Sequence, residues 1–145
     1  MLMVNLLLVY GCGTTMKPVR FRLLANSNPW VVSDAATYLV VIDKNWSNYY
    51  SSVPPGSDFA TYIYLVASRG VKPNPGYRIR IMEVRQLKDT VSIKLELKEP
   101  DPRKVYPQII VHPVAVAEIA KGDLEPCDIL NFVFIDQKGR ELVVA

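Results

Sequence analysis

Residues 77–98 read YRIRIMEVRQLKDTVSIKLELK, and this stretch decides the fold. Apolar and polar side chains alternate with a period of two in both halves, which predicts two strands that each bury one face. In the first half the apolar positions are odd-numbered up to Ile81 and then even-numbered at Met82 and Val84. A change of phase within one strand is typical of a β-bulge, which we expect near Ile81. Residues 86–90 are predicted to join the two strands as the loop of a hairpin.

Strand patterns continue on both sides of this hairpin. Residues 37–42 are rich in β-branched and aromatic side chains, which predicts a buried strand. Residues 59–67 are apolar on both faces, as in a central strand. The other predicted strands are 19–24, which alternates apolar and basic residues, 108–119, which Pro113 interrupts, and a final hairpin of 129–135 with 141–144.

One short helix is predicted over residues 43–53. Asp43 can cap its N-terminus, and an apolar stripe with helical spacing runs from Trp46 to Val53 before a Pro-Pro-Gly stop. The fold class that follows is mainly β. We expect a single antiparallel β-sandwich or barrel-like domain over residues 19–145, with this one helix.

Composition excludes several classes of function. Half of the 145 residues are apolar, which indicates a globular chain, and two cysteines are too few for a disulfide scaffold or a four-thiolate zinc site. No Walker or dinucleotide fingerprint occurs. Residues 69–104 hold ten basic and five acidic side chains, but the whole chain carries only +3, so no nucleic acid is expected as a partner. We expect neither a metal ion nor another cofactor.

The chain contains a single imidazole, His112, and no Ser lies in a G-x-S-x-G elbow. His112 precedes Pro113 within an apolar run, so we interpret it as a structural edge residue. No catalytic residue is predicted.

The N-terminus resembles a bacterial lipoprotein signal. Residues 1–11 are almost entirely apolar and end in Gly11 before Cys12, as in a lipobox, and the run is too short to span a bilayer. No basic residue precedes the run, and Tyr10 is bulky for its position. We therefore expect a signal segment at 1–11, a lipid on Cys12 and a tether at 12–18; the alternative is a first strand over residues 3–10.

The state expected for the second cysteine, Cys127, depends on whether Cys12 is lipidated. If Cys12 carries lipid, Cys127 is expected to be a small buried residue. If Cys12 is not lipidated, a Cys12–Cys127 disulfide becomes possible in an oxidising compartment.

Residues 70–77 are predicted to form a rigid loop between two strands. Pro73 and Pro75 fix φ, and Gly76 can take a positive φ. Rigidity lowers the cost of ordering on binding, so a loop of this kind suits contact with a partner. The predicted partner-binding residues are Arg69, Lys72, Pro73, Asn74, Pro75, Gly76, Tyr77 and Arg78. A tight hairpin loop without a partner is the alternative.

The stretch GVKPNPGYRI at residues 70–79, followed by Glu83-Val84 and the hairpin arm 87–97, resembles the C-terminal domain of the PrcB family of protease complex subunits. That domain shows a G-x-K-x-T-G-G-Y loop, then a hairpin, a P-x-P-like turn and a strand that ends near a lysine. The later parts match residues 99–102, residues 108–114 with His112-Pro113, and Lys121.

The resemblance covers residues 58–121, and the helix 43–53 with Trp46 is similar to a helix that precedes the domain. Asn74-Pro75 stand where the family has Thr-Gly, so the loop here is stiffer and lacks a hydroxyl. The family includes proteins with lipoprotein signals, and it implies association with a secreted, subtilisin-like protease complex.

Together these features predict a non-catalytic, secreted, lipid-anchored domain that binds another protein, as an accessory subunit of an extracellular protease complex. Its expected location is outside the cytoplasm, on a bacterial membrane. Two alternatives remain open: a protease inhibitor that uses loop 70–77, and a hydrolase that uses His112.

Overall fold

The hairpin predicted from residues 77–98 is the longest strand pair of the protein. The computed structural model describes residues 16–24, 34–43 and 56–142. Strand β5 (Arg78–Leu87) pairs with β6 (Thr90–Lys98) around a two-residue turn, and their register shifts between Ile81 and Glu83. The predicted bulge is therefore confirmed. The expectation that Met82 faces inward is wrong, because Met82 is the extra residue of the bulge and is exposed.

The first sheet has five strands in the order β1-β5-β6-β8-β9. Its remaining strands are β1 (Lys17–Pro18), β8 (Asn131–Ile135) and β9 (Glu141–Leu142). The final hairpin is confirmed, with β8 and β9 antiparallel across residues 136–140. The sheet is not wholly antiparallel as predicted, because β8 lies parallel to β6. The long connection through β7 lets the chain return to β6 in the same direction.

The second sheet has four strands in the order β2-β7-β4-β3. They are β2 (Arg22–Leu23), β7 (Val114–Ala120), β4 (Tyr62–Ser68) and β3 (Thr37–Val41). Strand β4 is paired on both sides and buried on both faces, as predicted for a central strand. Residues 59–61 form a turn before it, and β7 begins only after Pro113.

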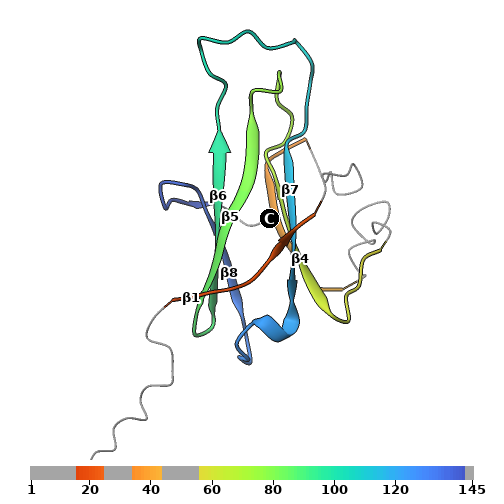
Figure 1. The fold of residues 1–145 in the computed structure, drawn as a ribbon, viewed down its shortest axis with the longest axis vertical. Coiled ribbons are helices and arrows are strands. Elements are labelled where there is room, and N and C mark those ends of the chain that lie inside the picture. Colours follow the sequence, from red (N-terminus) through yellow and green to blue (C-terminus); the bar gives the residue numbers. More distant parts are fainter. Residues whose placement is uncertain (1–15, 25–33, 44–55, 143–145) are drawn as a thin grey trace, which may run out of the picture.

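The segment predicted as one strand over residues 19–24 instead crosses from one sheet to the other. Lys17 and Pro18, at the end of the predicted tether, pair with β5, and Arg22 and Leu23 pair with β7. Figure 1 shows this segment in red, passing from β1 across the flank of the sandwich. We call residues 17–24 the strap.

The two sheets pack face to face over one apolar core. Its largest fully buried side chains include Phe134, Leu65, Ile81, Ile93 and Leu95, drawn from both sheets. The inward residues of β6 are the alternating Val91, Ile93 and Leu95, as the period of two predicts. No closed barrel forms, so the predicted β-sandwich is confirmed.

The predicted helix 43–53 and the predicted signal segment 1–11 lie outside the described residues, apart from Asp43. The only helical turn in the described part of the chain is a 3₁₀ turn, η4 (Lys121–Asp123). Among those same residues, no helix has both the length and the apolarity needed to cross a lipid bilayer.

Candidate binding site at one end of the sandwich

Two loops gather at one end of the sandwich, which is uppermost in Figure 1. They are residues 69–77, between β4 and β5, and residues 99–113, between β6 and β7. An isolated antiparallel bridge joins them, because the backbones of Lys72 and Val111 exchange two hydrogen bonds of 2.9 Å. We call this region the loop end; it contains every predicted partner-binding residue except Arg78, which begins β5.

The start of the first loop is fixed by a close backbone approach. Gly70 has φ of 77°, and a Cβ at this position would lie 2.5 Å from the carbonyl oxygen of Asp34. The next residue, Val71, donates its N–H to that same carbonyl over 2.9 Å. Only glycine suits this position.

The turn at Pro73–Gly76 is rigid, but not for the reason expected of Gly76. The side-chain oxygen of Asn74 accepts the N–H of Gly76 over 2.9 Å, which closes an Asx-turn. The predicted positive φ at Gly76 is wrong. A Cβ there would instead lie 2.8 Å from Pro100 Cβ and 2.9 Å from the ring of Tyr106, so close packing against residues 99–113 requires glycine.

The side chain of Arg69 links the first loop to the ends of β5 and β6. Its guanidinium donates to the carbonyl oxygens of Arg78 and Lys98 at 3.2 and 2.8 Å and to Glu99 at 2.7 Å, and its side chain is only 9% exposed. The ring of Tyr77 lies 5.3 Å from this guanidinium and 5.2 Å from the ammonium of Lys72. The structure thus brings two of the three predicted cations, Arg69 and Lys72, together around Tyr77. The guanidinium of Arg69 is engaged by partners within the protein.

The second loop is held in shape by its own polar groups. Asp101 accepts hydrogen bonds from the guanidinium and from the backbone N–H of Arg103, and these bonds lower the pKa of Asp101 below its usual value. Tyr106 accepts the N–H of Asp101 over 3.0 Å. These contacts fix the loop backbone without burying the side chains that follow.

Three apolar side chains of this fixed loop face solvent. Val105 is 99% exposed, Ile110 68% and Ile109 57%. We call these three residues the apolar patch. The prediction of binding residues missed them. The sequence does mark this segment, because residues 105–117 contain no Lys, Arg, Asp or Glu. An uncharged apolar run normally predicts burial, however, and only the three-dimensional structure shows that these side chains are exposed.

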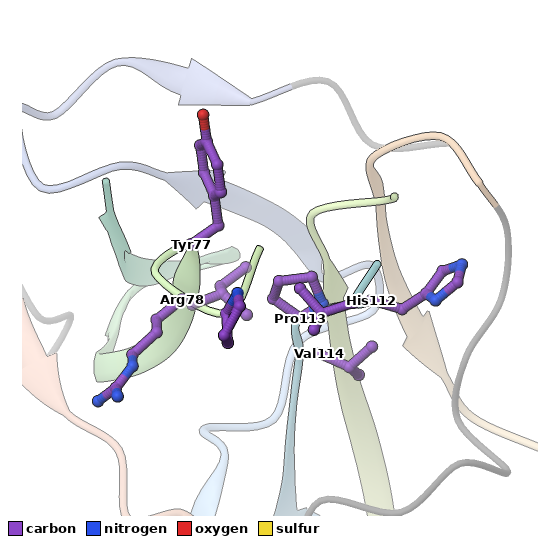
Figure 2. A pocket seen from close by; sticks show the side chains of 8 residues that line it. Tyr77, Arg78, His112, Pro113 and Val114 are labelled. Carbon is purple, nitrogen blue, oxygen red and sulfur yellow. The ribbon is translucent and has the colours of Figure 1, made fainter. Parts of the chain in front are cut away.

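A shallow hollow of about 260 Å³ lies between the two loops. It is lined by Tyr77, Arg78 and Ile79 on one side, by Val111–Val114 on the other, and by Pro75. Figure 2 shows that the side chains of Tyr77, Arg78 and His112 diverge rather than meet at one point. Nε2 of His112 lies 3.3 Å from a carboxylate oxygen of Asp34. Within the described residues, no group of three His, Cys, Asp or Glu side chains is placed to hold a metal ion.

A second, larger hollow of about 600 Å³ lies at the opposite end, beside η4. Cys127 lies there with an exposed, free thiol, which is 3.3 Å from the carbonyl oxygen of Lys88. The expectation that Cys127 is buried is therefore wrong. It belongs to an irregular connection, residues 124–130, that covers the edge of the core rather than entering it.

A protein-family comparison bears on the loop end directly. The family described as PrcB C-terminal matches residues 63–120. This segment of the chain is PrcB-like. The match confirms the resemblance predicted from the sequence, and it points to a role related to subunits of protease complexes. Comparisons with curated proteins and with solved structures gave no match.

The PrcB-like segment runs from β4 through β7, so it contains both loops, the hollow and the apolar patch. The strap, β8 and β9 lie outside it. The candidate binding site is therefore part of the family-matched region, whereas the elements that complete the first sheet are not.

Proposed function

We propose that this protein is a non-catalytic binding subunit of an extracellular protease complex. In this proposal a lipid on Cys12 holds the protein at a bacterial membrane, and the loop end contacts the partner. The PrcB-like segment supports the link to protease complexes. The sequence Leu6–Cys12, with its apolar run before Gly-Cys, supports the anchor.

The observation that carries the proposal is the apolar patch on a fixed loop. One exposed apolar side chain by itself is ordinary, but three on one loop together expose apolar area, and covering that area with a partner gains free energy. Contacts at Tyr106, Asp101 and Val111 already hold the backbone in place. Binding therefore requires little further ordering of the loop.

The geometry of Gly76 favours this surface over insertion of the tip of loop 70–77 into a protease cleft. An inserting loop must stand clear of the body of the inhibitor, whereas Gly76 is buried against Pro100 and Tyr106. The divergent side chains around His112 likewise favour binding over hydrolysis.

The test is affinity capture of the full-length protein from the envelope of its native host after mild cross-linking. We expect the wild type to capture a protease. The variant Ile109→Ser/Ile110→Ser should lose the protease, because two of the three apolar contacts are removed.

A matched control is Ile129→Ser at the opposite end of the molecule, where the side chain is 71% exposed. This variant should capture as much protease as the wild type. Equal capture by the patch variant, or hydrolysis that vanishes in His112→Ala, would contradict the proposal. In the same extract, the intact mass should show a diacylglycerol on Cys12 and loss of residues 1–11.

A further inference from the structure

One flank of the sandwich exposes the edges of both sheets. The strap covers β5 only at Arg85 and Gln86, with a further hydrogen bond of 2.8 Å from Val19 N–H to the carbonyl of Val84. In the part of the chain that the structure describes, no strand pairs with the outer edge of β5 from Arg78 to Glu83. An uncovered edge carries backbone groups that another chain can pair with.

The direction of these backbone groups follows from the neighbouring strand. The N–H and the carbonyl of Leu97 bond the side-chain amide of Gln137 at 3.0 and 2.9 Å, on the side of β6 away from β5. The backbone N–H and C=O groups of neighbouring residues on a strand point to opposite sides. Those of Lys98 therefore point toward β5, and those of its partner Arg78 point toward β6. The backbone groups of Ile79 therefore point outward from the edge.

The facing edge belongs to the segment that leads into β7. Val111 bonds Lys72, and the carbonyl of Pro113 accepts the N–H of Arg69 over 2.9 Å, both toward the β4 side. By the same alternation, the backbone groups of His112 and Val114 point to the other side. Both residues line the hollow, as Ile79 does.

The strap shows that this flank accepts an extended chain. Lower on the same flank, it pairs with β5 through Lys17 and Pro18 and with β7 through Arg22 and Leu23. The hollow is the upper, uncovered part of the same strip between the two sheets.

The charges beside the hollow indicate which peptide would fit. Arg78 and Lys98 are directly opposite each other in the β5–β6 register, and like charges in such a pair repel. One step along, Arg80 faces Glu96 and forms an ion pair of 3.4 Å. Neither Arg78 nor Lys98 forms an ion pair within the described structure, and the nearby Glu99 is held by Arg69. An acidic side chain from a partner would relieve this repulsion.

We propose that the hollow binds an extended acidic peptide of the partner protein, which adds as a strand to the free edge of β5 at Ile79. This inference rests on the proposed function, since it states which segment the partner contributes. Backbone hydrogen bonds would supply affinity, and Arg78 with Lys98 would select acidic residues at alternate positions.

The test is selection of displayed nine-residue random peptides on the full-length protein, followed by affinity measurements with the selected peptides made synthetically. We expect enrichment of peptides with alternating Asp or Glu. Ile79→Pro removes the outward N–H without removing a β5–β6 hydrogen bond, and affinity should fall about tenfold relative to Ile79→Ala, which keeps that N–H.

A second variant pair keeps the inference testable if the proline variant does not fold. Arg78→Gln/Lys98→Gln should weaken binding of the acidic peptides about fivefold or more, while Lys94→Gln, on the same sheet face, should not. Selection of no peptide, selection of basic peptides, or equal affinity for Ile79→Pro and Ile79→Ala would overturn the inference.

The two proposals can fail separately. If the wild type captures a protease but selects no peptide, the added strand is wrong and the proposed function stands. If acidic peptides bind but no protease is captured, the strand site stands and the proposed function is wrong.

Discussion

Gly76 shows how a single residue fixes the candidate site. Its backbone angles are open to any residue, yet Pro100 and Tyr106 leave no space for a side chain. The residue thereby docks the two loops of the loop end against each other. The sequence predicts a special role for Gly76, but not this one, because Pro100 and Tyr106 lie more than twenty positions further along the chain.

Gly76→Ala should therefore destabilise the protein by about 1–3 kcal/mol, the usual cost of adding a methyl group to a packed site. Urea unfolding measures this change. Gly122→Ala is the matched control, because nothing lies within 4 Å of a Cβ at that position and its effect should be small. Equal unfolding midpoints for the two variants would show that the loops can move apart without cost.

The cationic residues of the loop end were predicted as a group, and the structure brings Arg69 and Lys72 together, but not Arg78. Arg69, Lys72 and Tyr77 are close in sequence, so their proximity could be inferred from the hairpin alone. The burial of Arg69 could not be inferred in this way, because it depends on the carbonyl of Lys98, at the end of β6, and on Glu99 in the loop that follows.

Among the elements, the last hairpin depends on a buried carboxylate in its turn. Asp136 accepts the N–H groups of Arg140 and Lys138, each over 2.9 Å, and the guanidinium of Arg140 over 2.8 Å. The hydrogen bond from the Arg140 backbone is the main cause that holds the pKa of Asp136 below its usual value. The charged form of Asp136 therefore stabilises the turn.

The acid stability of the protein should reflect this group. A folded-state pKa below the unfolded value, about 3.9, gives stability that is present above that pH and is lost as the pH falls through the folded-state pKa. Asp136→Asn should be less stable than the wild type at pH 7, and the difference in melting temperature should shrink from pH 5 to pH 3.

The variant Arg140→Gln keeps the backbone donors, so it should retain most of this pH dependence. A difference between Asp136→Asn and the wild type that stays constant or widens in acid would contradict the assignment.

The elements themselves were largely predictable from local pattern. The period of two in residues 77–98 fixes β5, β6 and the bulge, and the two-sided apolar run fixes β4 as a central strand. Pairing between distant segments was not predictable. Strand β8 carries the same alternation whether it lies parallel or antiparallel to β6, and nothing local marks the point where the strap leaves one sheet for the other.

At the scale of the whole molecule, the strap connects the two sheets. Arg22 of the strap pairs with Glu118 of β7, whose side chain is only 7% exposed, whereas that of Arg22 is 72% exposed. The carboxylate of Glu118 thus lies in a mostly buried place and depends on a cation that comes from the N-terminal part of the chain.

Arg22→Met should lower the free energy of unfolding by about 1–3 kcal/mol, because it leaves Glu118 without its partner. Adding Glu118→Gln should restore part of that loss, and thermal unfolding of the four proteins completes a double-mutant cycle. Arg85→Met breaks the exposed Arg85–Glu83 pair and serves as the control, with an expected effect below about 0.5 kcal/mol. Independent effects of the two strap-pair substitutions would show that the pair is not coupled.

The connectivity of the sheets has a kinetic consequence. Arg22 of the strap and its partner Glu118 on β7 are 96 residues apart in the sequence, so the strap can dock only after β7 has been made. Strand β6 likewise gains its second neighbour only when β8 has been made. Chains dominated by such distant pairings fold in milliseconds to seconds rather than microseconds. A nascent chain that ends before Asn131 still lacks Phe134 over the core and leaves one side of β6 bare. The second sheet reaches its final order of strands once β7 has been made, whereas the first sheet has to wait for β8 and β9.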